Sequence, residues 1–178
     1  MKNFFLALAA SSALMAPVAQ AAIFVPPVTT AVFTGPVAVE KDSGVFNCIL
    51  TLTVDTGANF GGDGHGSWAH AHNATATAVL SDVSAPSVCP LILIDGTADV
   101  TAIEKPSGKT ILTFDGFSII PPISGGFCSG PIKAVWGGHA SLTRSIEVKT
   151  PLSDMAGGCR MIGEVVQVSG TSLEIYGD

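Results

Sequence analysis

Four widely spaced cysteines constrain the fold of this chain more than any other feature. They are Cys48, Cys89, Cys128 and Cys159, and they follow an amino-terminal segment with the pattern of an export signal. Cysteines of an exported protein enter an oxidising compartment, where an even number usually forms disulfides. No two of them are as close as the C-x2-C pairs of zinc sites. We therefore expect a fold that is cross-linked by two bridges.

Four cysteines allow three pairings. The sequence favours the sequential one, Cys48–Cys89 with Cys128–Cys159, and leaves the other two open. These bridges would close loops of about 41 and about 31 residues, each worth about 4 kcal/mol if chain entropy is the source.

The export signal is predicted to occupy residues 1–21. Lys2 gives it a positive start, residues 4–16 are almost all apolar, and Ala19-Gln20-Ala21 is a small-x-small cleavage site. The apolar run is too short for a membrane span of about 20 residues, and no later run is longer. Residues 22–178 then form a single secreted domain, which we expect to be extracellular or on the cell surface, with the periplasm as the other compartment.

Alternating apolar and polar residues predict an all-β fold. Side chains of one kind recur at every second position from residue 46 to residue 54, and no long helical pattern is present. Gly and Pro separate further short runs, which suggests a two-sheet sandwich or a barrel. The fold class expected is a two-sheet β-sandwich or jelly-roll-like domain of about nine or ten antiparallel strands. The expected strands are residues 29–39 with a break at Gly35-Pro36, 46–54, 74–83, 88–94, 97–104, 110–119, 132–136, 142–148, 161–168 and 172–176.

Charge excludes some classes of partner. Removing Lys2 from the 8 basic residues leaves 7 against 14 acidic ones, so the mature domain carries a net charge of about −7. Nucleic-acid binding needs a basic surface, and docking on an anionic membrane needs clustered cations. Only 12% of residues are charged, which leaves room for an apolar contact surface.

Three histidines form the one constellation with a chemical implication. His65, His70 and His72 lie in and after a glycine-rich segment, and His70 and His72 would share one face of a strand. Imidazoles so placed can bind Zn²⁺ or Cu²⁺, with Asp63 as a further ligand, although solvated histidines are the simpler interpretation.

A catalytic nucleophile is not expected. Residues 126–130 match G-x-C-x-G, but a nucleophile elbow needs a helix after the turn, and Pro131 with a strand-like run follows instead. We expect no enzyme activity and no cofactor.

Several segments together resemble the bacterial "protein activator of alkane oxidation" family, the PraB-like proteins. The segments are residues 33–39, 48–53, 87–92, 128–136, 159–163 and 173–175. The resemblance implies a small secreted protein that assists growth on hydrophobic carbon sources and carries no catalytic residues. Its partners would be hydrophobic interfaces or other cell-surface proteins, and self-association is compatible with it. The histidine-bearing segment 57–72 has no match in the family.

Chaperone–usher pilus subunits offer a second resemblance. They are exported β-sandwich proteins with an early disulfide of similar spacing and a Tyr near the C-terminus, where this chain has Tyr176. This alternative implies a sandwich that a neighbour's strand completes, and a role in adhesion.

Overall fold

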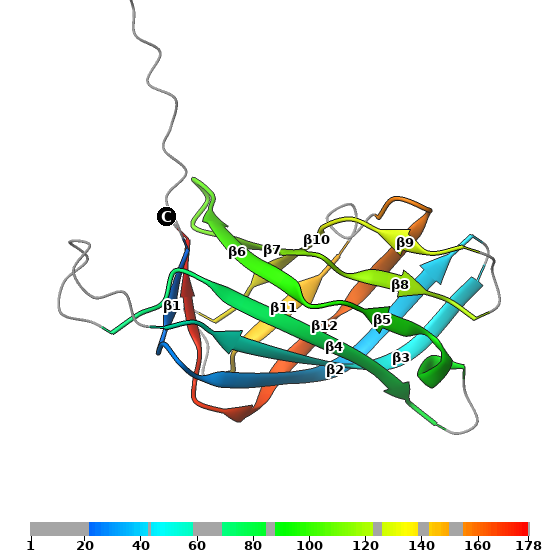
Figure 1. The fold of residues 1–178 in the computed structure, drawn as a ribbon, viewed down its shortest axis with the longest axis horizontal. Helices are drawn as coiled ribbons and strands as arrows, with labels where there is room; N and C mark the ends of the chain where they lie inside the picture. Colours follow the sequence, from blue (N-terminus) through cyan, green and yellow to red (C-terminus); the bar gives the residue numbers. More distant parts are fainter. Residues whose placement is uncertain are drawn as a thin grey trace, which may run out of the picture.

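Strands form most of the described protein. The computed structural model describes residues 22–42, 44–58, 69–84, 88–122, 126–138, 143–149 and 155–177. The predicted signal segment lies outside these residues. The elements are β1 (Ile23–Val25), β2 (Thr30–Lys41), β3 (Gly44–Thr56), β4 (Ala74–Asp82), the 3-10 turn η1 (Cys89–Leu91), β5 (Leu93–Asp95), β6 (Ala98–Glu104), β7 (Thr110–Asp115), β8 (Ser118–Ile120), β9 (Cys128–Ser129), β10 (Ile132–Trp136), β11 (Ser145–Val148), β12 (Cys159–Gly170) and β13 (Glu174–Tyr176) (Figure 1).

Eight of these strands close into one antiparallel barrel. Their order around the barrel is β2, β3, β4, β6, β7, β10, β11 and β12, and β12 pairs again with β2. The prediction of an all-β fold is therefore confirmed, but the expected two-sheet sandwich is wrong. Strand alternation is the same in both architectures, and only the pairing of the first long strand with the last distinguishes them.

Glycines at the seam between β2 and β12 permit this closure. A Cβ atom on Gly163 would lie 2.3 Å from the carbonyl oxygen of Pro36, and one on Gly35 would lie 2.2 Å from that of Glu164. The two backbones approach too closely for any side chain at these positions. The expected break at Gly35-Pro36 is also wrong, since β2 continues through both residues in register with β3, where Pro36 pairs with Ile49.

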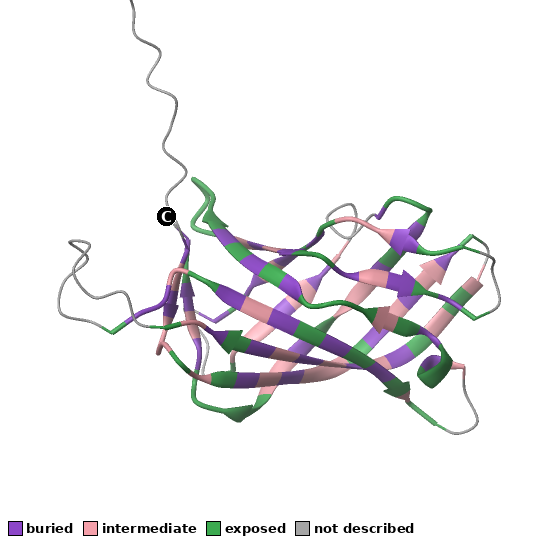
Figure 2. Cartoon of the chain, viewed as in Figure 1, coloured by how far each residue is buried: buried purple, intermediate pink, exposed green. Residues whose placement is uncertain are grey.

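Alternate residues of every barrel strand fill the interior (Figure 2). In β3 the inward side chains are Cys48, Leu50, Leu52 and Val54, as the sequence pattern predicts. Trp136 is buried and meets the ring of Phe33 edge-on at 6.1 Å. The core combines large rings with alanines on β4 and β6, such as Ala76 and Ala102.

A two-stranded ribbon of β1 and β13 caps one end of the barrel, at the left in Figure 1. Its inward side chains Phe24 and Ile175 are fully buried. The Thr56 hydroxyl donates to the carbonyl oxygen of Pro26 at 3.0 Å, which joins the end of β3 to the turn after β1. Just before β13, Leu173 N–H donates to Gln167 Oε1 at 3.1 Å and so fixes the turn from β12 to β13.

A three-stranded side sheet of β5, β8 and β9 lies outside the barrel ladder. β4 pairs with β6 only over Ala74–Ala76, and β5 packs beside β4 where that pairing stops. The inner row of the side sheet is Ile94, Ile119 and Cys128, and it faces the core. The side sheet therefore covers the part of the barrel wall where β4 and β6 have separated.

Two expected strands differ from the structure for local reasons. Residues 88–94 were expected as one buried strand, but Pro90 supports the 3-10 turn η1 and only Leu93–Asp95 is extended. Residues 110–119 divide into β7 and β8 at Gly116, which has a φ of 121°. That conformation favours glycine, and a Cβ there would lie 2.8 Å from the carbonyl oxygen of Thr97.

Candidate functional site

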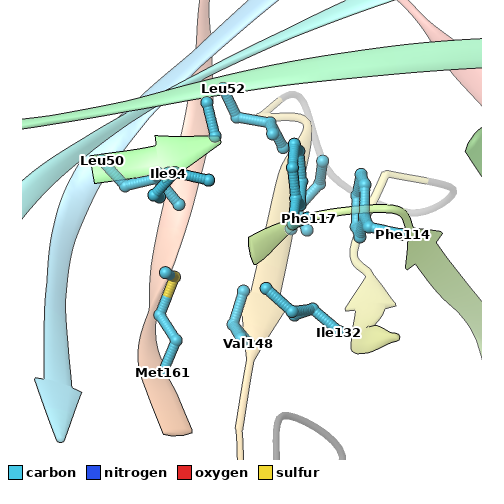
Figure 3. A pocket seen from close by; sticks show the side chains of 10 residues that line it. Leu50, Leu52, Ile94, Phe114, Phe117, Ile132, Val148 and Met161 are labelled. Carbon is cyan, nitrogen blue, oxygen red and sulfur yellow. The ribbon is translucent and has the colours of Figure 1, made fainter. Parts of the chain in front are cut away.

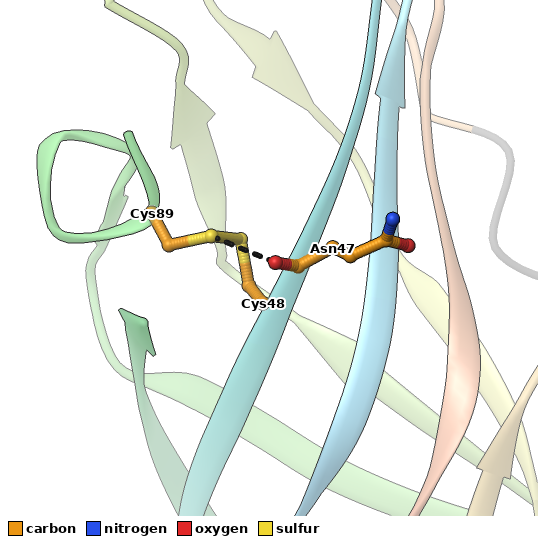
Figure 4. Close-up of a disulfide and its surroundings, with 3 residues drawn as sticks. All are labelled: Asn47, Cys48 and Cys89. Carbon is orange, nitrogen blue, oxygen red and sulfur yellow. Dashed lines mark hydrogen bonds between the residues drawn. A yellow bond between two sulfur atoms is a disulfide. The ribbon is translucent and has the colours of Figure 1, made fainter. Parts of the chain in front are cut away.

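Both disulfides form with the predicted connectivity. Cys48–Cys89 joins η1 to the inner face of β3 with a Cα–Cα distance of 5.6 Å, and Cys89 Sγ lies 3.2 Å from the carbonyl oxygen of Asn47 (Figure 4). Cys128–Cys159 joins β9 to the start of β12 with a Cα–Cα distance of 5.8 Å. All four cysteines are paired, so Cys128 is not a thiol nucleophile. Two disulfides are compatible with the predicted extracellular or periplasmic location.

The outer face of the side sheet carries an apolar row. Leu93 on β5 pairs with Ile120 on β8, and Phe127 lies one residue beyond the Ile119–Cys128 pair, beside Ile120. The exposed fractions of Leu93, Ile120 and Phe127 are 57%, 38% and 63%. We call these three residues the apolar row. Leu91 in η1, two residues before Leu93, is 60% exposed.

The next row of this face is polar and almost uncharged. It consists of Asp95, Ser118 and Ser129, which pair across the three strands. The inner face of the same strands is bonded through Cys128 to β12, and η1 is bonded to β3. The apolar row is therefore exposed on a sheet that two covalent links hold against the barrel, and ordinary core packing does not explain its side chains.

A small apolar cavity lies inside the barrel. It has a volume of about 20 Å³ and lies between barrel side chains such as Leu50, Val148 and Met161 and the two covering side chains Ile94 and Phe117 (Figure 3). Its lining is entirely apolar, and a volume of this size accommodates about one water molecule. A chain hydrocarbon does not fit in this cavity.

The structure brings together two of the three predicted metal ligands. His70 is almost fully buried and His72 half-buried, and their rings meet edge-on with centroids 4.9 Å apart. His65 and Asp63 lie outside the described residues. Within the described ranges, no three His, Cys, Asp or Glu side chains are grouped to hold a metal ion. The metal site stays a prediction, for which the structure provides two neighbouring histidine rings.

Among the same described residues, no helix has the length and hydropathy that a membrane crossing requires. The pilus alternative requires a sheet with a missing strand. In the part of the chain that the structure covers, the barrel ladder is continuous, with β2 and β12 paired to each other.

No family model, curated protein or solved structure matches this chain. The resemblance to the alkane oxidation activator family therefore stays a prediction, and the surface features above are the basis for a functional proposal. Sequence reasoning missed the apolar row. Its members come from three short strands that are far apart in the sequence, and only their register shows that they are neighbours.

Proposed function

We propose that this protein is an exported, non-enzymatic surface protein that uses the apolar row to contact hydrophobic material. The material would be a hydrocarbon phase such as alkane droplets at the bacterial cell surface. The observation that carries the proposal is the exposure of Leu93, Ile120 and Phe127 on a covalently fixed sheet. Moving such side chains from water into oil is favourable by about 25 cal/mol per Å² of apolar surface.

Charge and patch size favour a continuous apolar phase as the occupant. The adjoining row offers one carboxylate, that of Asp95, so few charged groups need to lose water when the face meets oil. A stable interface between protein copies uses roughly 20–30 residues a side, and the apolar row with Leu91 is much smaller. The small volume of the apolar cavity inside the barrel also favours contact at the surface over carriage of a ligand inside.

Adsorption to hexadecane droplets tests this proposal. Replacing Leu93 and Phe127 by Ser should lower the partition of the protein onto droplets at least about ten-fold, because two half-exposed side chains account for about 2–4 kcal/mol. The matched control is Val79→Ser with Val168→Ser, two residues that are 64% and 59% exposed on β4 and β12. Equal adsorption of the two double variants would contradict the proposal, provided that both unfold in urea like the unaltered protein.

A further inference from the structure

The hairpin of β6 and β7 has a second unusual surface, on strands that do not belong to the side sheet. Its outward residues pair like with like across the two strands. From the open end to the turn, the pairs are Asp99 with Asp115, Thr101 with Thr113, and Ile103 with Ile111, followed by Lys105 and Lys109 at the base of the turn. The outer face of the hairpin thus changes in steps from acidic to hydroxyl, aliphatic and cationic.

Cationic residues gather at this face although the protein is acidic. Lys133 on β10 pairs with Thr113, and Lys149 follows β11 one residue beyond the Ala134–Val148 pair. With Lys105 and Lys109, these are 4 of the 7 Lys and Arg residues that follow the predicted signal, since Lys2 is the eighth; one of the 4, Lys149, is ion-paired with Glu147 on β11. Of the other three, Arg144 bonds to Glu174, Arg160 lies 3.7 Å from Glu40, and Lys41 donates to the carbonyl oxygen of Gly157.

A groove of about 170 Å³ lies between two of these lysines, Lys105 and Lys133. It is lined by Ile103, Lys105, Ile111, Thr113 and Lys133, and we call it the lysine-flanked groove. Ile103 is 51% exposed. The half-buried Val135 pairs with Ile111 on β10, so the aliphatic floor continues across three strands, which is a width of about 10 Å.

The two lysines of the groove indicate what it would bind. Lys105 and Lys133 line the same groove, and an anion bound between them lowers the repulsion between the two cations. An exposed aliphatic floor beside the cations adds a place for an apolar chain.

We propose that the lysine-flanked groove binds single-chain amphipathic anions, with a carboxylate between Lys105 and Lys133 and an alkyl chain of about 10 Å over Ile103 and Ile111. The site is independent of the apolar row and differs in chemistry, because it selects the head group as well as the chain. It would give the protein a way to bind the charged products or surfactants that accompany an oil phase.

Titration of the ¹⁵N-labelled protein with sodium octanoate tests the site. Amide signals of Ile103, Ile111 and Lys133 should shift with saturation, whereas acetate and 1-octanol should bind at least about three-fold more weakly because each lacks one half of the ligand. Octanoate affinity should also fall between about 0.01 M and about 0.15 M salt, since the screening length shortens from roughly 30 Å to roughly 8 Å.

Two substitutions and a control make the result specific. Lys105→Gln and Lys133→Gln should each weaken octanoate binding about three-fold or more, and Arg160→Gln, the same charge change on the outer face of β12, should leave it unchanged. Octanoate binding equal to that of 1-octanol would overturn the proposal. So would unchanged affinity in both lysine variants, or shifts that lie outside β6, β7 and β10.

Discussion

Two glycines determine whether the barrel can close. Gly35 and Gly163 lie where β2 and β12 meet, and each faces a backbone carbonyl at a distance that admits no Cβ atom. These positions are constrained by close approach, because neither residue has a φ in the left-handed region. Other glycines, such as Gly108 in the turn between β6 and β7, face open space and are constrained by φ instead.

Gly163→Ala adds only one methyl group, but it should lower the stability of the protein clearly. The added methyl group must displace the Pro36 carbonyl or the Cα of Val37, which would lie 2.3 Å and 2.8 Å away. Forced shifts of this kind cost about 1–3 kcal/mol, and we expect a loss near 2 kcal/mol in urea unfolding. The control is Gly108→Asn, which keeps a residue tolerant of positive φ and should cost less than about 1 kcal/mol. A Gly163→Ala protein as stable as the parent would contradict the close approach of the β2 and β12 backbones at this position.

At the residue scale the sequence predicted much of the interior. The alternation in residues 46–54 correctly predicted which side chains of β3 point inward, including Cys48. The burial of Trp136 also follows the ordinary behaviour of a large ring under a sheet. The exposure of Leu93 and Phe127 could not be predicted, because an apolar residue in a short strand carries no sign of the face on which it lies.

Among the elements, the side sheet depends most on covalent links. Its strands have two or three residues each, and such short ladders are not stable alone. Cys128 holds β9 to β12, and the inner row packs on the core. The apolar row is presented to solvent because these links and this packing oppose its collapse.

Replacing Cys128 and Cys159 by Ser should release this sheet. We expect the free energy of unfolding to fall by about 2–5 kcal/mol, and limited proteolysis to cut first between β8 and β10. The comparison variant, with Cys48 and Cys89 replaced by Ser, should be cut near η1 instead, since that bridge holds a different segment. The same first cleavage site in both variants would show that the bridges do not have separate roles.

Elements with strong local signals were predicted well, and those set by tertiary contacts were not. The strands expected at residues 97–104 and 110–119 flank Pro106-Ser107-Gly108, and β6 and β7 form there as a hairpin. Residues 88–94 were assigned to a strand because their composition is apolar, but Pro90 and the bridge at Cys89 impose a 3-10 turn. β9 has only two residues and no sequence signal of its own.

For the whole molecule, closure makes the barrel a single cooperative unit. Every barrel strand is paired on both sides, so no strand can leave without breaking two ladders. The sequence predicted the all-β class and both disulfides, but it suggested nine or ten strands where the described residues form thirteen. It could not show that β12 returns to β2, since that contact joins the two ends of the domain and leaves no local pattern.

This closure predicts a single unfolding transition. Urea curves from far-ultraviolet circular dichroism and from the fluorescence of Trp136 should coincide, with Trp68→Phe used to isolate the Trp136 signal. Amides in β2, β3 and β12 should exchange with solvent most slowly, because these strands form the longest ladders. An earlier fluorescence transition would mean that the interior around Trp136 opens before the strands separate.

The most direct test of the central claim is to find which residues touch oil. The protein is adsorbed to hexadecane droplets that contain a photoactivatable alkyl diazirine, irradiated, and digested for mass spectrometry. Labels should concentrate on Leu91, Leu93, Ile120 and Phe127, with the barrel strands labelled no more than in protein without droplets. Labels spread over the buried side chains of β2 and β3 would show that adsorption unfolds the protein, and labels on another outer face would show that the apolar row is not the contact surface.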